Sequence, residues 1–286
     1  MAESTVVDGL VVVDKPSGWT SHDVVARCRK IFGQKRVGHS GTLDPGATGV
    51  LLVGLGRVTR LLRFLADLPK SYDAEVVLGV ETTTLDADGE VVTTHDMSGV
   101  TVEAARAAAA QLTGDILQVP PMVSAVKVGG KRLHALARRG EEVERAARPV
   151  TVHRFEVEAG PEPGVLRIEV ACSSGTYVRS LAADLGRALG GGAHLRDLRR
   201  TTIGSFTLAD AVPLDRVGPE HVCSPAVALR DYPAVTVGPD QASLVRHGRG
   251  VALDGTPEGP YAVVDQGGDL LAIHEGGKPV VVLATH

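Results

Sequence analysis

The chain has 286 residues, is 43% hydrophobic and 3% aromatic, carries a formal net charge of −4, and has only three cysteines, all far apart. This composition excludes a disordered chain and predicts one large domain, or a large domain with a small one. The separated cysteines disfavour a zinc site and a disulfide framework. Because there is neither a signal-peptide pattern nor an apolar run near the roughly 20 residues of a membrane span, we expect a cytoplasmic protein.

The first part of the chain predicts strands and helices in alternation. Strands are expected over residues 10–13, 50–55 and 71–80, and helices over residues 21–32, 58–66 and 101–112. Ser21 is the expected N-cap of the first helix, with Asp23 in its first turn and Gly33 at its end. The segment TTTLDADGEVV predicts a loop and a turn that lead into a further strand.

The second part predicts a hairpin, two longer strands and two helices. Pro and Gly pairs in PPMVSAVKVGG bracket the hairpin, and KRLHALARR predicts a short basic helix. Strands are expected over residues 150–158 and 166–172, and a helix over residues 177–190. From Tyr232 onward, short β-like runs with many glycines and no helical pattern predict a small β domain. The expected fold class is therefore α/β (α+β), with a mixed, largely antiparallel central sheet.

Positive charge is concentrated in three blocks, although the chain as a whole is acidic. Residues 15–70 hold ten Lys or Arg against three Asp or Glu, residues 127–154 hold eight against three, and residues 179–200 hold five against two. A single block would be read as a solvated helix face. Because a long-range field depends on where charges lie, three blocks favour a polyanionic partner.

One glycine-punctuated loop surrounds a single carboxylate. The stretch VGHSGTLDPGATGV, residues 37–50, contains four glycines, His39 and Asp44. An Asp-Pro pair alone is usually an Asx-type turn, so the glycines and the basic flanks are what make Asp44 a candidate catalytic acid. A nearby guanidinium would keep it ionised, and Arg179 in SSGTYVRS is the best candidate, although the spacing also fits a solvated arginine.

Other catalytic classes lack their motifs. There is no Gly-x-Ser-x-Gly elbow, no phosphate-binding GxxxxGK[ST] loop and no HExxH or Cys/His cluster. Glycoside chemistry would need a second carboxylate. Asp23, Asp67 and Asp86 are available for that role, but none has a matching sequence context.

Eight segments in sequence order resemble the tRNA pseudouridine synthase B family. They are DKPSGWTSHDVV, RVGHSGTLDPGATGVLLVGLGRVTR, KSYDAEVVLG, TTTLDADGE, PPMVSAVKVGGKRLHALARRG, ARPVTV, SSGTYVRSLAADLG and LRRTTIG. The resemblance covers roughly residues 9–210. It implies a pseudouridine synthase fold and an isomerase that acts without cofactor or metal on the T-loop uridine of tRNA, at tRNA position 55. The base would be flipped out of the RNA before its glycosidic bond is cut.

The resemblance also assigns residues to roles. Asp44 is the expected catalytic aspartate, as nucleophile or as base, Arg179 its ion-pair partner, and Tyr72 a ring that stacks on the flipped base and assists proton transfer. The expected substrate-binding residues are His39, Tyr177, Leu198 and Lys15, the last as a support of the site. The expected RNA-binding residues are Arg36, Arg57, Arg60, Lys127, Lys131, Arg132, Arg138 and Arg199.

The domain organisation expected from the resemblance has three parts. Residues 1–228 form the catalytic domain, residues 120–150 within it form a thumb that closes over RNA, and residues 229–286 form a small PUA-like module. For that module, a β cap without RNA contact is an equal alternative. Some relatives carry a bulky apolar residue where this chain has Gly46.

The expected partner is the tRNA T-arm stem-loop, with no membrane, no required protein partner and a monomeric state. Two rival functions stay open. One is a tRNA-binding folding chaperone with secondary or lost isomerase activity, and the other is the same isomerase acting on ribosomal or guide-directed RNA.

Overall fold

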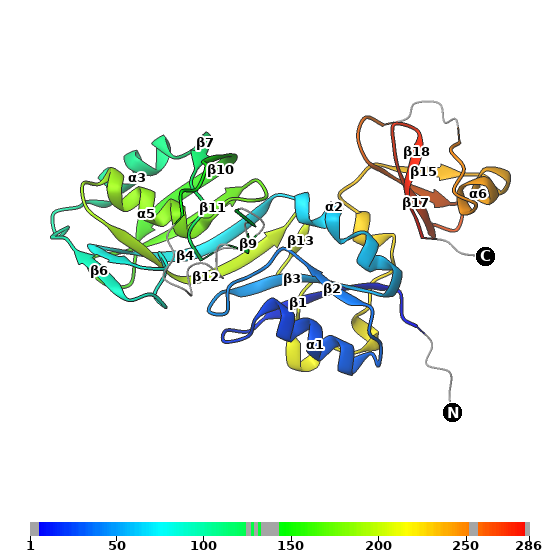
Figure 1. Ribbon diagram of the computed structural model, residues 1–286, viewed down its shortest axis with the longest axis horizontal. Coiled ribbons are helices and arrows are strands. Elements are labelled where there is room, and N and C mark those ends of the chain that lie inside the picture. The colour runs from blue at the N-terminus through cyan, green and yellow to red at the C-terminus, as the bar shows by residue number, and fades with distance from the viewer. Residues whose placement is uncertain (1–5, 124–126, 129–130, 133–142, 252–256, 284–286) are drawn as a thin grey trace. The chain divides into compact units, whose positions relative to one another are not determined.

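The computed structural model describes residues 6–123, 127–128, 131–132, 143–251 and 257–283. The contacts within the chain divide it into two compact units. Unit 1 joins Met1–Pro45, Gly49–Asp67 and Ile203–His286, and unit 2 joins Gly46–Thr48 and Leu68–Thr202. Most helices and strands of both units are labelled in Figure 1.

The N-terminal part of unit 1 is a small mixed sheet with helices. Its elements are β1 (Gly9–Lys15), α1 (Ser21–Ile31), β2 (Val37–Ser40), β3 (Thr48–Leu55), the 3-10 helix η1 (Gly56–Arg60), α2 (Leu62–Asp67), β13 (Phe206–Thr207), β14 (Val212–Pro213), and the 3-10 helices η2 (Leu214–Arg216), η3 (Pro219–His221) and η4 (Val227–Leu229). Strand β1 pairs antiparallel with β3 and parallel with β14, and β2 pairs antiparallel with β3.

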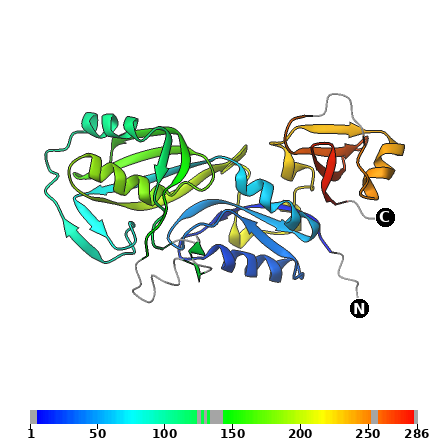
Figure 2. The ribbon, with the colours of Figure 1, turned by 45° about the horizontal axis from the view of Figure 1, so that its top comes forward.

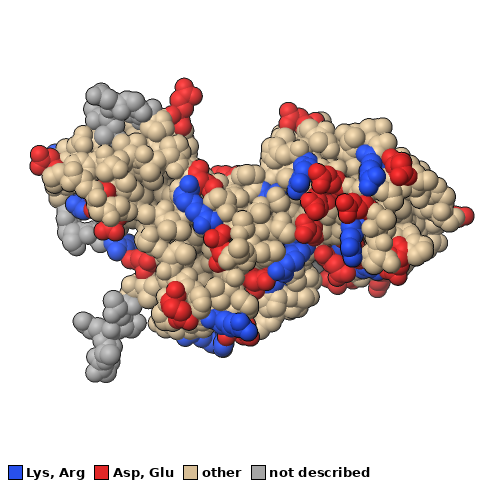
Figure 3. Space-filling model, turned by 180° about the vertical axis from the view of Figure 1, so that it is seen from behind, with Lys and Arg blue, Asp and Glu red and all other residues tan. Residues whose placement is uncertain are grey.

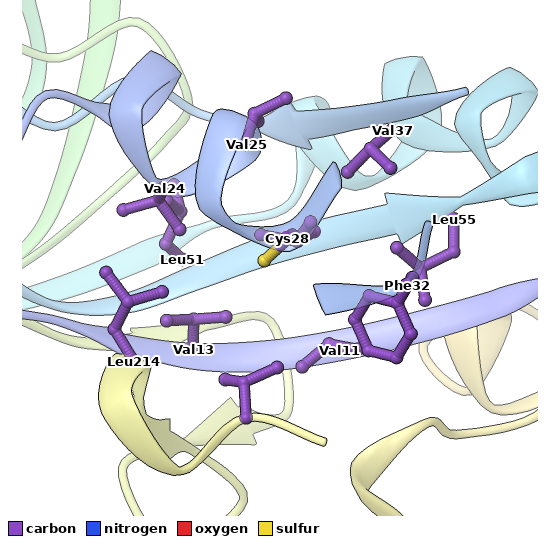
Figure 4. Close-up of a cluster of buried hydrophobic side chains, with 12 residues drawn as sticks. Val11, Val13, Val24, Val25, Cys28, Phe32, Val37, Leu51, Leu55 and Leu214 are labelled. Carbon is purple, nitrogen blue, oxygen red and sulfur yellow. The ribbon is translucent and has the colours of Figure 1, made fainter. Parts of the chain in front are cut away.

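Helix α1 covers one face of this sheet. Val11 and Val13 on β1 pack against Val24 and Cys28 of the helix in a fully buried cluster (Figure 4). Each such buried aliphatic side chain stabilises the fold by roughly 1.5–3 kcal/mol. Because Leu10 and Val12 are also buried, residues 10–13 form a continuous apolar run.

The N-cap of α1 lies one residue earlier than the sequence predicted. Thr20, not Ser21, is the N-cap, and it forms a capping box in which Thr20 Oγ1 accepts from the Asp23 amide and Asp23 Oδ2 accepts from the Thr20 amide. The Ser21 hydroxyl is used instead on the loop that holds Asp44. The assignment was wrong because both residue types cap helices equally well.

The C-terminal part of unit 1 is a four-stranded module with its own core. Its elements are β15 (Ala234–Val237), α6 (Pro239–Arg246), β16 (Tyr261–Asp265), β17 (Leu270–Glu275) and β18 (Lys278–Val282), with the strands in numerical order. The small β domain is thus present, but the expectation of no helix after Tyr232 was wrong. Helix α6 is short and begins with Pro239 at its first position, where proline fits best.

Three hydrogen bonds join this module and its linker to η1 and α2. Arg57 Nη1 donates to the Leu283 carbonyl (2.8 Å), and Arg60 Nη1 donates to the Val282 carbonyl (2.6 Å). The Tyr232 hydroxyl donates to the Phe64 carbonyl (2.8 Å). The expected division of the chain at residue 228 stays a prediction.

Unit 2 is built on long antiparallel strands with helices on one side. Its elements are β4 (Lys70–Leu78), β5 (Val80–Thr82), β6 (Val91–Thr94), α3 (Val102–Gln111), β7 (Gly114–Gln118), β8 (Lys127–Val128), β9 (Lys131–Arg132), β10 (Arg148–Ala159), β11 (Val165–Cys172), α5 (Val178–Ala188) and β12 (Ala193–Ile203). Strands follow the order β12-β4-β11-β10-β7. Helix α3 packs on β10 and contacts α5 (Figure 2).

The two faces of this sheet differ sharply in chemistry. On β4, Tyr72 and Val76 are buried, while Asp73 and Glu75 lie on the other face, where charged residues of the neighbouring strands line a hollow of about 440 Å³. Acidic and basic side chains are interspersed on the molecular face drawn in Figure 3. In unit 2, Arg196 of β12 donates to Glu75 Oε2 (2.6 Å).

The segment expected to form the thumb is described only in part. Strands β8 and β9 pair as the predicted hairpin. Lys131 and Arg132 belong to β9, so the basic helix expected to begin there does not include them; the rest of that helix lies outside the described residues. No helix in the described part of the chain is long and apolar enough to cross a membrane.

A buried histidine in the C-terminal module faces a buried tyrosine. His274 and Tyr261 are opposite residues on β17 and β16, both fully buried, with ring centroids 5.7 Å apart. Within the described part of the chain, the two ring nitrogens of His274 and the Tyr261 hydroxyl have no hydrogen-bond partner. Burial lowers the pKa of His274, because a charged imidazole has no solvation there.

This pair predicts that the module loses stability in mild acid. Above about pH 6.5, His274 is neutral in both the folded and the unfolded chain. Below that pH the unfolded chain binds a proton at His274 more readily than the folded chain does. The free energy of unfolding therefore falls by up to about 1.4 kcal/mol per pH unit. Urea unfolding at pH 7.5, 6.5 and 5.5 should show a smaller loss of stability for His274→Phe than for the wild type. Equal pH dependence of the two proteins would contradict the prediction.

Candidate active site

Asp44 lies in the loop between β2 and β3 and is half-buried. The backbone on either side of it is held by two buried side chains of unit 1. Lys15 Nζ donates to the carbonyls of Pro45 (3.1 Å), Trp19 (2.6 Å) and Pro16 (3.0 Å). Pro45, the residue after Asp44, is therefore hydrogen-bonded to the fully buried ammonium group of Lys15.

Ser21 holds the other side of the same loop. Its hydroxyl accepts from the Leu43 amide (2.9 Å) and donates to the Leu43 carbonyl (3.2 Å). Two of the four glycines in the loop have left-handed backbone conformations, Gly41 at φ +74° and Gly49 at φ +101°. These contacts position Asp44 before any substrate binds.

His39 lies on β2, before this loop. Its ring is half-buried and packs edge-on against His22 of α1, with centroids 5.3 Å apart. The expectation that His39 contacts the space left by a flipped base stays a prediction.

In unit 2, Arg179 is the second residue of α5 and is almost fully buried. Its Nη1 donates to the Thr84 carbonyl (2.9 Å) and lies 3.3 Å from Asp86 Oδ2, and its Nη2 donates to the Val123 carbonyl (2.8 Å). A cation in the first turn of a helix opposes the helix dipole, so these acceptors offset that cost. The sequence offered Asp86 only as one of three possible second carboxylates, and the structure pairs it with Arg179.

Tyr177 precedes α5 and is clamped by a buried amide. Gln118 of β7 accepts from the Tyr177 amide (2.7 Å) and donates to its carbonyl (3.1 Å). The N-cap residue makes no side-chain capping bond of its own, so Gln118 satisfies part of this helix end. Nothing in the sequence distinguished Gln118 from an ordinary strand residue.

Tyr72 is buried on β4, beside β12. Asp197 of β12 has a left-handed backbone, φ +53°, which is uncommon for a residue other than glycine and typical of a bulge. Arg196 contacts Glu75 and Arg199 lines the charged hollow, so strand alternation places Leu198 and Arg200 on the opposite face, with Tyr72. Leu198 therefore lies on the same face of the sheet as Tyr72, and its role as a pocket wall stays a prediction.

The expected RNA-binding residues occupy varied positions. Arg36 Nε donates to Thr59 Oγ1 (3.1 Å), Arg199 Nη1 contacts Thr48 Oγ1 (3.3 Å), and Arg57 pairs with Asp8 (2.6 Å). Arg60 is exposed apart from its bond to Val282. Lys127, Lys131 and Arg132 lie on β8 and β9, and Arg138 lies outside the described residues. The described residues contain no group of three or more His, Cys, Asp or Glu placed to hold a metal ion.

Two family models together match most of the chain. The model described as TruB family pseudouridylate synthase (N terminal domain) matches residues 29–178, and the one described as tRNA pseudouridylate synthase B C-terminal domain matches residues 179–225.

The chain belongs to the TruB family.

Curated relatives of this TruB-family chain match over almost its whole length. The tRNA pseudouridine synthase B of Mycobacterium sp. (strain KMS) is 50% identical over 99% of this chain and 98% of the relative. That of Arthrobacter sp. (strain FB24) is 49% identical over 98% of this chain and 97% of the relative. The resemblance inferred from the sequence is confirmed, and with it the enzyme class, a pseudouridine synthase.

Solved structures share the fold. A chain in "Structure of H/ACA RNP bound to a substrate RNA containing 2'-deoxyuridine" has a TM-score of 0.72 at 25% identity, covering 95% of this chain and 79% of that chain. A chain in "Crystal Structure of a Cbf5-Nop10-Gar1 Complex" has a TM-score of 0.71 at 27% identity, covering 97% and 84%. The predicted α/β fold with a C-terminal β region is thus confirmed.

The clamp around Asp44 predicts that Lys15 supports both stability and turnover in this TruB-family enzyme. In Lys15→Met three carbonyls lose a buried donor, and we expect a loss of about 2–3 kcal/mol in the free energy of unfolding. The single-turnover rate should fall more than RNA affinity does, because the Asp44 loop is displaced. Lys30→Met, at the exposed end of α1, is the matched control for urea unfolding and kinetics. Equal unfolding free energies and equal single-turnover rates for Lys15→Met and Lys30→Met would contradict the prediction.

The ion pair of Arg179 predicts a role for Asp86. Asp86→Asn removes one charged partner of a buried guanidinium, an interaction worth about 1.5–3 kcal/mol. We expect turnover to fall about 10- to 100-fold, measured as single-turnover pseudouridine formation. The matched control is Asp73→Asn. Asp73 belongs to the same unit and lies on the charged face of β4, opposite Tyr72, so this variant should keep the wild-type rate. A wild-type rate for Asp86→Asn would show that the carbonyl acceptors suffice.

Proposed function

We propose that this chain converts the uridine at position 55 in the T-loop of tRNA into pseudouridine. The observation that carries the proposal is the 50% identity to a curated tRNA pseudouridine synthase B over 99% of this chain. The matched N-terminal family model includes His39, Asp44 and Tyr72, and the C-terminal one begins at Arg179. The residues assigned from the sequence thus all fall within matched segments, except Lys15.

The reaction rearranges bonds within one nucleotide. The bond from the ribose C1′ to uracil N1 breaks, a bond from C1′ to uracil C5 forms, and one proton leaves C5 while one is gained at N1. Asp44 begins this sequence, either by attack on the ribose or as a base. Its rigid loop supports the assignment, because a preorganised carboxylate needs little rearrangement at the moment of reaction.

From the family resemblance, Arg179 is proposed to keep Asp44 ionised during the reaction. A guanidinium near a carboxylate keeps that carboxylate ionised, and a nucleophile or base must be ionised to act. The bonds from Arg179 to Thr84, Val123 and Asp86 fix its position within unit 2. Tyr72 and Leu198 are proposed to hold the flipped uracil between an aromatic and an aliphatic side chain.

The target base must first leave the RNA stack, which costs a few kcal/mol. We propose that contacts from the basic blocks to the phosphates of the T-arm offset this cost, and such contacts weaken as salt rises. The enzyme is proposed to act in the cytoplasm as a monomer, without a protein partner or a cofactor. The C-terminal module is proposed as an RNA-contacting surface of the PUA type.

The proposal is tested with a T-arm stem-loop RNA labelled at its uridine. Wild-type protein should form pseudouridine, and Asp44→Asn should bind the RNA but lose turnover by on the order of 1,000-fold or more. Asp67→Asn, at the exposed end of α2 in the same unit, is the matched control and should keep the wild-type rate.

The other outcomes separate the rival functions. Tight binding without product from wild-type protein would favour a folding chaperone over an enzyme. Product formed only on ribosomal or guide-paired RNA would move the substrate away from tRNA. Undiminished turnover by Asp44→Asn would remove Asp44 from the chemistry.

A further inference from the structure

Arg200 is the largest fully buried side chain of the described residues, with an exposed fraction of 1%. It lies on β12, next to β4, and its side chain is hydrogen-bonded to that of Tyr72, which is 8% exposed. Burying a guanidinium is costly unless acceptors surround it. Burial lowers the pKa of Arg200, and the contact with Tyr72 acts in the opposite direction.

The direction of this hydrogen bond is fixed by chemistry. A guanidinium has five N–H donors and no acceptor, so the phenol oxygen of Tyr72 must accept. The O–H hydrogen of Tyr72 therefore points away from Arg200. A phenol held in this way has a defined rotation about its C–O bond, and it can donate only into the remaining space around its oxygen.

The fixed hydroxyl bears on what the phenol can do in the reaction. The isomerisation removes a proton from uracil C5 and adds one at N1. A hydroxyl with a defined orientation is suited to assist a proton transfer of this kind.

The backbone of β12 makes this contact possible. Arg196 and Arg199 contact or line the charged face of the sheet, and the left-handed Asp197 lies between them. Arg200 follows as the next residue and reaches the buried face, where Tyr72 lies. Three arginines of one strand thus have two different environments, and only Arg200 among the three is buried.

We propose that Arg200 is a positioning residue of the isomerase: by donating to the Tyr72 hydroxyl it orients that group for proton transfer to and from the flipped uracil. The proposal rests on the proposed function and adds a residue to its machinery. Arg200 acts through Tyr72 and does not itself touch the substrate. It differs from an arginine that merely fills the core, because its effect on the reaction requires the Tyr72 hydroxyl.

A double-mutant cycle tests this dependence. The variants are Arg200→Met, Tyr72→Phe and the combination of both. The matched control is Arg167→Met, which lies on the charged face of the same sheet and outside the three basic blocks. The single-turnover rate of pseudouridine formation and the dissociation constant for the T-arm stem-loop are measured for each. Urea unfolding of each variant confirms that it is folded.

We expect Arg200→Met to slow single turnover about 10- to 100-fold, within the range of general acid–base effects, and to change RNA affinity less than about 3-fold. In the Tyr72→Phe protein the same change should have little further effect, because the hydroxyl it orients is gone. Arg200→Lys should restore part of the rate, since it keeps the charge and a donor. Arg167→Met should match the wild type.

Two results would overturn the proposal. Effects of Arg200→Met and Tyr72→Phe that simply multiply would show that the arginine acts elsewhere, and a wild-type rate for Arg200→Met would show that it does not act at all. If Arg200→Met does not fold, Arg200→Lys is introduced into the wild-type protein and into Tyr72→Phe, and the two changes in rate are compared in the same way. Absence of product from wild-type protein would instead contradict the proposed function.

Discussion

The ammonium group of Lys15 is the interaction on which the candidate site depends. A buried cation must find acceptors, and the three carbonyls that Lys15 contacts belong to two separate segments, one of them next to Asp44. The need to solvate one charge therefore folds the loop before β3 against the turn after β1. The backbone next to the carboxylate thereby gains a fixed position.

The same constraint recurs in unit 2. Arg179, Gln118 and Arg200 are buried polar side chains, and each is hydrogen-bonded to a neighbouring segment of unit 2. Gln118 fixes the backbone of Tyr177, Arg179 gathers the loop of Asp86, and Arg200 reaches Tyr72. In both units, solvation of buried donors is what gives the candidate residues defined positions, since a buried donor without an acceptor costs about 1–3 kcal/mol.

Much of the architecture could be predicted from the sequence. Apolar periodicity located β1, α1, α3 and α5, because burial on one face is written directly into residue order. The cap at Thr20 and helix α6 were missed, since neighbouring residues cap equally well and a short helix has little periodicity. The role of Asp86 and the burial of Arg200 could not be predicted, because they depend on contacts across the fold. The carboxylate at Asp44 was visible because its glycines make it locally unusual.

The left-handed residue in β12 has a consequence for how this strand tolerates change over evolutionary time. Substitution at Asp197 by glycine or asparagine preserves the backbone that these residue types adopt readily. Deletion of Asp197 alone would restore plain alternation and keep Leu198 and Arg200 on the face of Tyr72. Deletion of Leu198 would instead shift the later residues of the strand by one position, which exchanges their faces. Arg200 would then turn toward the charged face, and Arg199 toward Tyr72. The number of residues between Asp197 and Arg200 is thus under stronger constraint than the residue type at Asp197.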